Sequence, residues 1–342
     1  MKMDFSVGLG RGDKAEEIAD LAKTAEECGF SQMTFVDQPT LDRDLHVMMT
    51  LAALNTRRIK IGHGVTDPFT FHPSVIANAT ATIHELSGGR AFIGIGAGGP
   101  FGKVMKPRPL SELREAVLFL KKYTSGEEAE FKGSKMHSEW VRGQIPVYIA
   151  CTHGSKSLEM AGELGDGVIM GDSHPQIVRW RMEQIARGAE RAGRDPSKID
   201  VWVRTEILVA KSKKEAHREV SSYAATWARA RYWSLQRKTP EAAELAERME
   251  TVEPGILDEL KKIHDAWTPS QHEVLDAPVS RLVSQRLVDF NYLTGTPDDI
   301  CERIPQLGKL GVTNMSTVTF TIVDKKGMMR EISNRIMPHF PN

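Results

Sequence analysis

The regular alternation of short apolar segments with amphipathic helical segments constrains the fold most strongly. Residues 4–9 (DFSVGL) have a strand-like composition, and in residues 13–29 Ile18, Leu21 and Ala25 share one helical face before Gly29 can end the helix. The same order recurs along the chain. Eight such units predict an α/β fold, a (β/α)8 TIM barrel that forms a single domain over residues 1–342. The expected strands are 4–9, 32–37, 60–65, 91–96, 147–151, 167–171, 200–210 and 314–320, and helices are expected near 13–29, 44–55, 73–86, 109–124, 155–165 and 174–193.

Two segments interrupt this alternation. Residues 125–146 are polar and rich in glycine, which predicts a loop insertion or a small hairpin before the fifth strand. Residues 211–296 are too long for one crossover helix and contain several helical runs. Because barrels accept insertions after the carboxyl ends of their strands, we interpret 211–296 as a helical cap insertion after the seventh strand, close to the substrate.

An open, doubly wound sheet is the main alternative fold. The stretch GIGAGGPFGK (94–103) has the glycines of a dinucleotide-binding turn, but that turn belongs to the first strand–helix unit and must open a helix. Here the glycines follow the fourth strand, and Pro100 comes next. The context therefore favours the barrel.

Charge and composition exclude several classes of partner. Lys+Arg and Asp+Glu are balanced at 45 each, so nothing in the net charge favours nucleic acid or an anionic membrane. The basic, aromatic run at 227–238 has helical spacing, which favours a helix with aromatic residues packed inward or covering a substrate. Three widely spaced cysteines and the lack of a long apolar run predict a cytoplasmic protein that binds a small molecule.

The carboxyl ends of the strands are where a barrel binds its ligand and performs chemistry. The residues at these ends are mostly small or glycine, which lets a flat ligand approach the backbone closely. No cluster of His, Asp and Glu has the spacing of metal ligands, and no G-x-S-x-G nucleophile motif occurs, so we expect no metal site.

Four stretches resemble the bacterial-luciferase-like superfamily of flavin- and F420-dependent oxidoreductases. They are IKIGHGVTDPFTFHPSVIANATATIHELSGGRAFIGIGAG (59–98), AEECGFSQMTFVDQP (25–39), GSKSLEMAGELGDGVIMG (154–171) and GTPDDICERIPQLGKLGV (295–312). They look most like the branch that includes methylenetetrahydromethanopterin reductase. The resemblance implies a TIM barrel, coenzyme F420 or alternatively FMN as cofactor, and a homodimer.

The resemblance also implies the cofactor site. In this superfamily a bulge after the third strand often contains a non-proline cis peptide that supports the ring of the cofactor, and here that peptide would be Gly64–Val65. The alternative is an ordinary glycine bulge. The turn around Thr152, Gly154 and Ser155 opens a helix and suits a phosphate, although any helix N-cap looks similar. The expected cofactor-binding residues are Gly64, Val65, Thr66, Gly96, Gly98, Cys151, Thr152, Gly154, Gly171 and Asp172. Lys103 and Arg108 are further candidates for a phosphate or an acidic tail.

Three side chains are candidates for acid–base chemistry: Asp37, His63 and Glu206. As an alternative to acid–base chemistry, Asp37 could bind the backbone amides of a loop. His63 could instead pack between the barrel and its helices. Glu206 is expected to share a face with Arg204 and to form either a buried ion pair or a catalytic acid. His72 and His153 lie near the same rim.

These observations predict an F420-dependent oxidoreductase that transfers hydride between the cofactor and a small organic substrate. The alternatives are an FMN-dependent monooxygenase that receives reduced flavin from a separate reductase, and a non-catalytic flavin-binding protein. Asp67, Phe69 and Phe71 depart from the loop of the reductase branch, so the resemblance leaves the substrate open.

Overall fold

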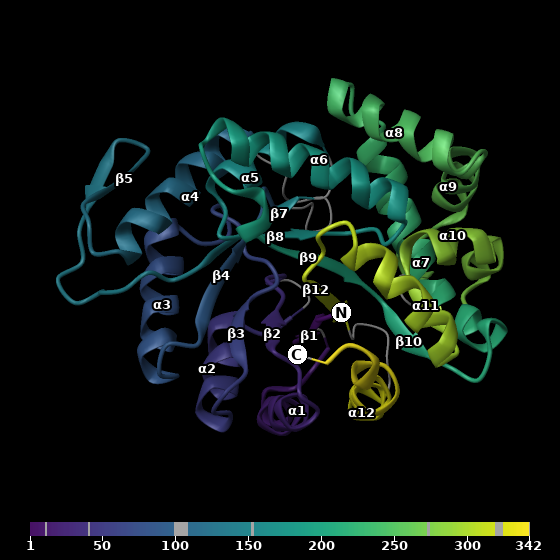
Figure 1. Ribbon diagram of the computed structural model, residues 1–342, viewed down its shortest axis with the longest axis horizontal. Helices are drawn as coiled ribbons and strands as arrows, with labels where there is room; N and C mark the ends of the chain where they lie inside the picture. The colour runs from purple at the N-terminus through teal and green to yellow at the C-terminus, as the bar shows by residue number, and fades with distance from the viewer. Residues whose placement is uncertain are drawn as a thin grey trace.

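The centre of the molecule is a closed barrel. A computed structural model of the chain describes residues 1–10, 12–39, 42–98, 109–151, 154–271, 274–318 and 324–341. Within them, eight parallel strands form the ring, which the first and last strands complete (Figure 1). In that closing pair Ser6 Oγ donates a 2.9 Å hydrogen bond to Asn314 Oδ1. The predicted (β/α)8 barrel is therefore confirmed. Around the ring the strands are β1 (Asp4–Leu9), β12 (Asn314–Val318), β9 (Asp200–Thr205), β8 (Gly167–Met170), β7 (Val147–Cys151), β4 (Ala91–Ile95), β3 (Lys60–His63) and β2 (Gln32–Phe35).

Helices surround the barrel and bury their apolar faces against it. Local sequence sets where they begin and end: Pro73 occupies the first turn of its helix, and Gly29 follows another helix with a φ of +84°, the left-handed conformation that glycine adopts readily. The helices predicted between the first seven barrel strands are all present. The surrounding elements are α1 (Ala15–Glu27), α2 (Leu45–Asn55), α3 (Pro73–Leu86), α4 (Leu110–Thr124), α5 (Ser155–Leu164), α6 (Pro175–Arg191), η1 (Pro196–Lys198), α11 (Pro297–Gly308), α12 (Lys325–Arg335) and η4 (Met337–His339).

A layer of aromatic side chains fills the barrel interior below its carboxyl end. The ring of Trp202 lies 4.7 Å from Tyr148 and 5.5 Å from Phe92, measured between ring centroids. Two glycines make room for these rings. A Cβ atom added at Gly62 would lie 2.3 Å from the Phe92 ring, and one added at Gly167 would lie 2.2 Å from the Tyr148 ring. The aromatic layer therefore packs the barrel interior below the carboxyl ends of the strands.

The first predicted insertion forms a small hairpin. Strands β5 (Ala129–Phe131) and β6 (Ser134–Met136) pair antiparallel and project from the side of the barrel near α4 (Figure 1).

Residues 211–296 contain several helices and also a strand, at 293–295, that we did not predict. The segment 200–210 is not one strand: β9 ends at Thr205, and β10 leaves the barrel to pair with β11 in a separate parallel ladder. Glu206 lies at this break. The elements are β10 (Ile207–Val209), α7 (Lys213–Leu235), α8 (Pro240–Val252), α9 (Ile256–Ala266), η2 (Pro269–Gln271), η3 (Pro278–Leu282), α10 (Gln285–Asn291) and β11 (Leu293–Gly295).

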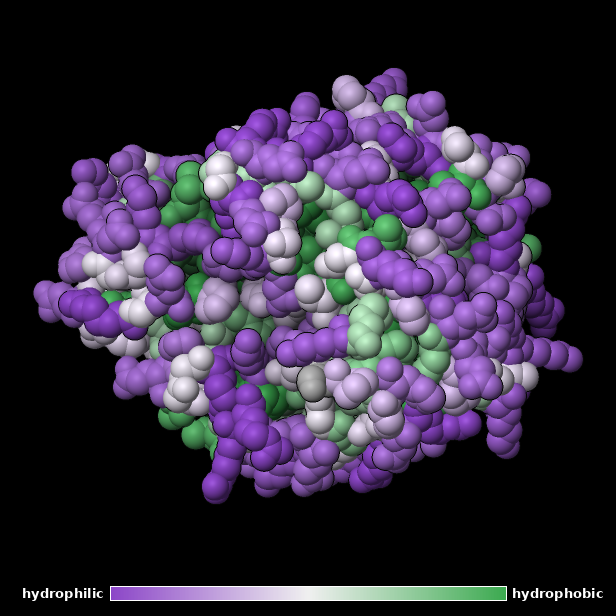
Figure 2. Space-filling view, viewed as in Figure 1, coloured by the Kyte–Doolittle hydropathy of each residue, from purple (hydrophilic) through white to green (hydrophobic). Residues whose placement is uncertain are grey.

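The face of the molecule in Figure 2 is mostly hydrophilic, with apolar side chains in small groups between the polar ones. No helix in the described ranges is long and apolar enough to cross a membrane.

Candidate functional site

A cavity of about 240 Å³ opens at the carboxyl end of the barrel. One side is formed by the ends of β7, β8, β9 and β12 and by the turn after β3, and the other by α7 and the junction of α10 with β11. The predicted insertion therefore contributes directly to this cavity. Its lining residues are Val65, Ala150, Ile169, Met170, Gly171, Asp172, Arg204, Thr205, Glu206, Tyr223, Trp227, Arg231, Asn291, Tyr292 and Val318.

The turn after β3 has the expected conformation. The Gly64–Val65 peptide is cis, as the resemblance implied, and the side chain of Val65 lines the cavity. Backbone hydrogen bonds hold the turn on both sides: Gly64 N donates to Phe35 O at 2.7 Å, and Thr66 N donates to Gly94 O at 2.9 Å. The turn is thus fixed by β2 and β4 rather than by its own residues.

Glycines on β4 make room for this turn. A Cβ atom at Gly94 would lie 2.1 Å from the carbonyl oxygen of His63, and one at Gly96 would lie 3.3 Å from Val65 Cγ2. Gly98 has a φ of +73° and lies near Asp67. The glycine pattern that superficially resembles a nucleotide-binding turn therefore lets the β3 turn pack closely onto β4.

Arg204 and Glu206 both line the cavity, as their spacing predicted. The Arg204 guanidinium donates a hydrogen bond to the carbonyl oxygen of Gly64, which ties β9 to the β3 turn. Burial lowers the pKa of Arg204, and the nearby Tyr223 and Glu206 oppose this shift. Glu206 is 1% exposed. The cavity thus contains a buried carboxyl group beside a guanidinium group.

A second charged cluster lies at the end of β8. Asp172 has a φ of +60°, which is uncommon for a residue other than glycine, and its carboxylate is shared by Arg181 and Arg231. Arg231 Nη2 lies 2.8 and 2.9 Å from the two carboxylate oxygens. Arg181 also donates to the carbonyl oxygen of Gly171. This cluster connects α6 and α7 to the end of β8.

Sequence reasoning missed Asn291 and Tyr292, which line the cavity from the end of α10. The pairing of β10 with β11 places them there: Leu293 N donates to Glu206 O at 2.9 Å, and Thr205 Oγ1 donates to Asn291 O at 2.6 Å. The aromatic run at 227–238 did point to this wall, because Trp227 belongs to both.

Asp37 lies beside the β3 turn, outside the cavity lining. Thr66 Oγ1 donates a 2.7 Å hydrogen bond to its carboxylate, and the side chain is 5% exposed. Burial raises the pKa of Asp37 to about 6, the Thr66 hydrogen bond opposes that rise, and Asp67 and Asp44 add to it. Asp37 thus connects β2 to Thr66, next to Val65.

His63 points away from the cavity, between the barrel and α2. Its Nδ1 lies 3.4 Å from Phe92 O and its Nε2 lies 3.3 Å from His46 Nε2. Burial, and then His46, lower the pKa of His63 well below its usual range. His72 is at the N-cap of α3, where it accepts a hydrogen bond from Ser74 N. Of the three acid–base candidates, only Glu206 lines the cavity.

Of the remaining residues predicted to bind the cofactor, some line the cavity and others pack against helices. Gly171 lines the cavity, whereas the Cys151 thiol faces α5, 3.1 Å from Ser157 O, and burial raises its pKa to about 12. Gly154 is the N-cap of α5 and packs under Glu241, whose Cβ would lie 2.7 Å from an added Cβ. Thr152, His153, Lys103 and Arg108 lie outside the described residues.

In the part of the chain that is described, no group of three or more His, Cys, Asp or Glu side chains could hold a metal ion.

A closed parallel barrel with a cavity at the carboxyl ends of its strands is the arrangement found in barrel enzymes. The family model described as luciferase-like monooxygenase matches residues 2–314. The chain therefore belongs to this family, and it is an oxidoreductase of the luciferase-like class.

Individual relatives match between about half and nearly all of the chain. The 5,10-methylenetetrahydromethanopterin reductase of Archaeoglobus fulgidus is 31% identical over 98% of this chain and 99% of its own length. The F420-dependent glucose-6-phosphate dehydrogenase of Nocardia farcinica is 31% identical over 56% of this chain and 64% of its own. Among solved structures, the coenzyme F420-dependent tetrahydromethanopterin reductase of Methanopyrus kandleri superposes with a TM-score of 0.81 at 25% identity and full coverage of both chains.

Proposed function

We propose that the protein transfers hydride between coenzyme F420 and a small organic substrate in the cavity at the barrel mouth. The observation that carries this proposal is that Val65, from the turn after β3, lines the cavity opposite α7. The relatives named as F420-dependent enzymes support the choice of cofactor. The cofactor supplies the redox chemistry by giving or accepting a hydride at its ring.

The residues of the cavity fit a flat ring system. Val65, Ala150 and Ile169 offer an apolar surface, and the space beside Gly171 is open, because a Cβ atom added there would meet no atom within 4 Å. We infer that these residues hold the ring, while the cavity excludes water from it. We infer that Glu206, which lines the cavity, holds or delivers a proton to the substrate.

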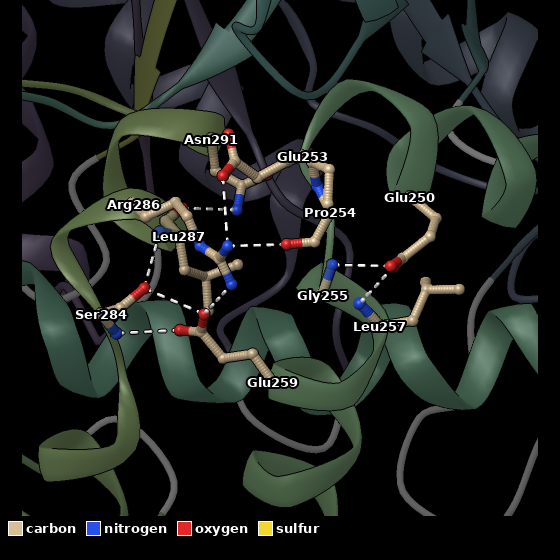
Figure 3. A network of polar contacts seen from close by, with 10 residues as sticks. All are labelled: Glu250, Glu253, Pro254, Gly255, Leu257, Glu259, Ser284, Arg286, Leu287 and Asn291. Atoms are coloured by element: carbon tan, nitrogen blue, oxygen red, sulfur yellow. Dashed lines mark hydrogen bonds and ion pairs between the residues drawn. The ribbon is translucent and has the colours of Figure 1, made fainter.

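Residues 211–296 form the substrate-side wall in this proposal. Figure 3 shows the polar contacts that hold part of this segment together. The Arg286 guanidinium donates to Pro254 O at 2.8 Å and pairs with Glu253 at 3.3 Å, while Ser284 Oγ donates to Glu259 at 2.9 Å. Because these contacts join α10 to the α8–α9 turn, we infer that the segment acts as one cap over the substrate.

An anaerobic titration of the purified protein with F420 and, separately, with FMN tests the cofactor. Saturable binding of F420, followed by its fluorescence, is expected, with weaker binding of FMN. Val65→Ala should weaken F420 binding, whereas Val75→Ala on the outer face of α3, 47% exposed, should not. Preference for FMN would instead favour a monooxygenase served by a separate reductase, tested by oxygen consumption. Tight binding without turnover of any substrate would favour a flavin-binding protein.

We also propose that the protein is a homodimer that associates through α2. This helix is apolar on nearly all sides, and its outward residues Val47 and Leu54 are 54% and 61% exposed. A helix of this kind is normally buried on both faces. Leu54→Glu should halve the molar mass of the protein measured by light scattering. Leu275→Glu in the cap should leave that mass unchanged, although Leu275 is 57% exposed, nearly as much as Leu54. A native chain that is already monomeric would contradict the proposal.

A further inference from the structure

The side chain of Arg204 crosses the interior of the barrel. Arg204 is on β9, and β9 and β3 lie on opposite sides of the ring: β8, β7 and β4 separate them one way round, and β12, β1 and β2 the other. The Arg204 guanidinium group nevertheless donates a hydrogen bond to the carbonyl oxygen of Gly64, directly after β3. This bond therefore joins two strands that do not pair with each other.

Two glycines leave room for the guanidinium group. A Cβ atom added at Gly64 would lie 3.2 Å from Arg204 Nη1, and one added at Gly8 on β1 would lie 3.3 Å from Arg204 Nη2. Both distances are shorter than an ordinary van der Waals contact, so a side chain at either position would press on the guanidinium group. The group therefore lies in a slot between the backbones of β1 and the β3 turn, which restricts its position.

The Gly64 carbonyl group belongs to the peptide that leads into Val65. The backbone bonds of the turn use the groups around it: Gly64 N donates to β2, Thr66 N donates to β4, and Thr66 O accepts from β4. The carbonyl group between them is held by the side chain of Arg204. Because a peptide unit is planar, the orientation of this carbonyl group helps to set the direction in which the Val65 side chain points.

The side chain of Val65 has little room to adjust at the cavity wall. It packs on the aromatic layer that contains Trp202, and a Cβ atom added at Gly94 would lie 3.2 Å from Val65 Cγ1. Closely packed interiors transmit displacements instead of absorbing them. A shift of the Gly64 carbonyl group would therefore move Val65 relative to the cavity that it lines.

We propose that Arg204 is a positioning residue for the cofactor: by fixing the Gly64 carbonyl group, it sets the position of Val65, against which the ring binds. The inference rests on the proposed function, which places the ring on Val65. A direct bond from Arg204 to the cofactor is a different role, because Arg204 also lines the cavity. The two roles differ in how far the effects of Arg204 and Val65 depend on each other.

Hydrogen exchange of the cofactor-free protein, followed by mass spectrometry, tests whether Arg204 holds the turn. Arg204→Met keeps a long side chain and removes the donors, so amides 64–66 should exchange about tenfold faster or more. Arg204→Lys, which keeps a donor group, should recover part of the protection. Arg90→Met is the matched control, because Arg90 Nη1 donates a 2.7 Å hydrogen bond to Ile59 O, at the other end of β3. It should lower the melting temperature and leave the exchange of amides 64–66 unchanged.

A double-mutant cycle tests whether Arg204 acts through Val65. Fluorescence titration with F420 should give a dissociation constant about tenfold higher or more for Arg204→Met, and a higher one also for Val65→Ala. If Arg204 acts through Val65, the double variant should bind hardly more weakly than the weaker of the two single variants. Independent contacts would multiply the two losses. Arg90→Met should bind F420 like the native protein.

Three results would overturn the proposal: unchanged exchange of the turn in Arg204→Met, unchanged F420 affinity in that variant, or losses that multiply in the double variant. The last result would assign Arg204 a direct contact with the cofactor. If Arg204→Met does not fold, Arg204→Gln, which keeps a polar group between the two glycines, replaces it in the same measurements. A native protein that binds no F420 would refute the proposed function instead, and the exchange of the turn would then decide whether Arg204 fixes it.

Discussion

The carboxyl group of Asp37 should make the stability of the protein depend on pH. Its pKa is raised from 3.8 to about 6 in the folded chain, mainly by burial. At a pH between these two pKa values, the Asp37 carboxyl group is mostly protonated in the folded chain and mostly ionised in the unfolded chain. The resulting stabilisation is present below about pH 4 and is lost as the pH rises to about 6. At neutral pH the buried carboxylate costs about 3 kcal/mol, because each pKa unit corresponds to about 1.4 kcal/mol.

Asp37→Asn removes the charge and keeps the shape. The variant should be more stable than the native protein at pH 7.5, and the difference in the free energy of unfolding should shrink by about 2 kcal/mol at pH 4.5. Urea unfolding of both proteins at the two pH values measures this. A difference of the same size at both pH values would refute the reasoning.

Thr66→Val gives an independent check with a defined sign. The Thr66 hydrogen bond lowers the pKa of Asp37, so its loss should raise that pKa further and increase the cost of the carboxylate at pH 7.5. The expected loss of stability is about 1.5–3 kcal/mol, the usual contribution of a hydrogen bond to a charged group. On the Asp37→Asn background the same substitution should cost less. Equal losses on both backgrounds would show that Thr66 acts independently of the carboxylate.

Three further predictions concern the barrel, the site and the cap. Gly94→Ala should destabilise the protein by about 3 kcal/mol in urea unfolding, because the new Cβ would lie 2.1 Å from the His63 carbonyl oxygen, whereas Gly171→Ala, which meets no atom within 4 Å, should cost far less. Glu206→Gln should lower kcat at least about 100-fold while F420 affinity changes little; an unchanged kcat would exclude Glu206 as the acid. Arg286→Ala removes the contacts between α10 and the α8–α9 turn, so amide hydrogen exchange should rise in the cap and not in the barrel, and uniform exchange would contradict this.

The barrel was predictable because each strand and helix is specified locally. Apolar runs such as 147–151 and helical stops such as Gly29 carry their own signal, and eight repeats leave few alternative topologies. The break at Glu206 was not predictable. VRTEILVA reads as one strand, and what separates β9 from β10 is pairing with β11, which comes from a segment of only three residues.

The same reasoning explains the partial prediction of the site. Glu206 was found by treating 200–210 as one strand, on which residues two apart share a face, although β9 ends at Thr205. Asn291 and Tyr292 reach the cavity through the β10–β11 pairing, a contact between distant segments that no local pattern records. His63 also precedes the β3 turn, yet its side chain faces α2, and the sequence left both orientations open.

The pairing of β1 with β12 has a consequence for synthesis of the protein. The bond between Ser6 and Asn314 joins residues 308 positions apart, so the ring cannot close until nearly the whole chain has left the ribosome. Until then the β1 edge that later receives β12 has no pairing partner, and such edges are prone to aggregation. Ribosome-associated chaperones that shield the first strands should therefore raise the yield of this protein more than that of a protein whose terminal strands pair with their sequence neighbours.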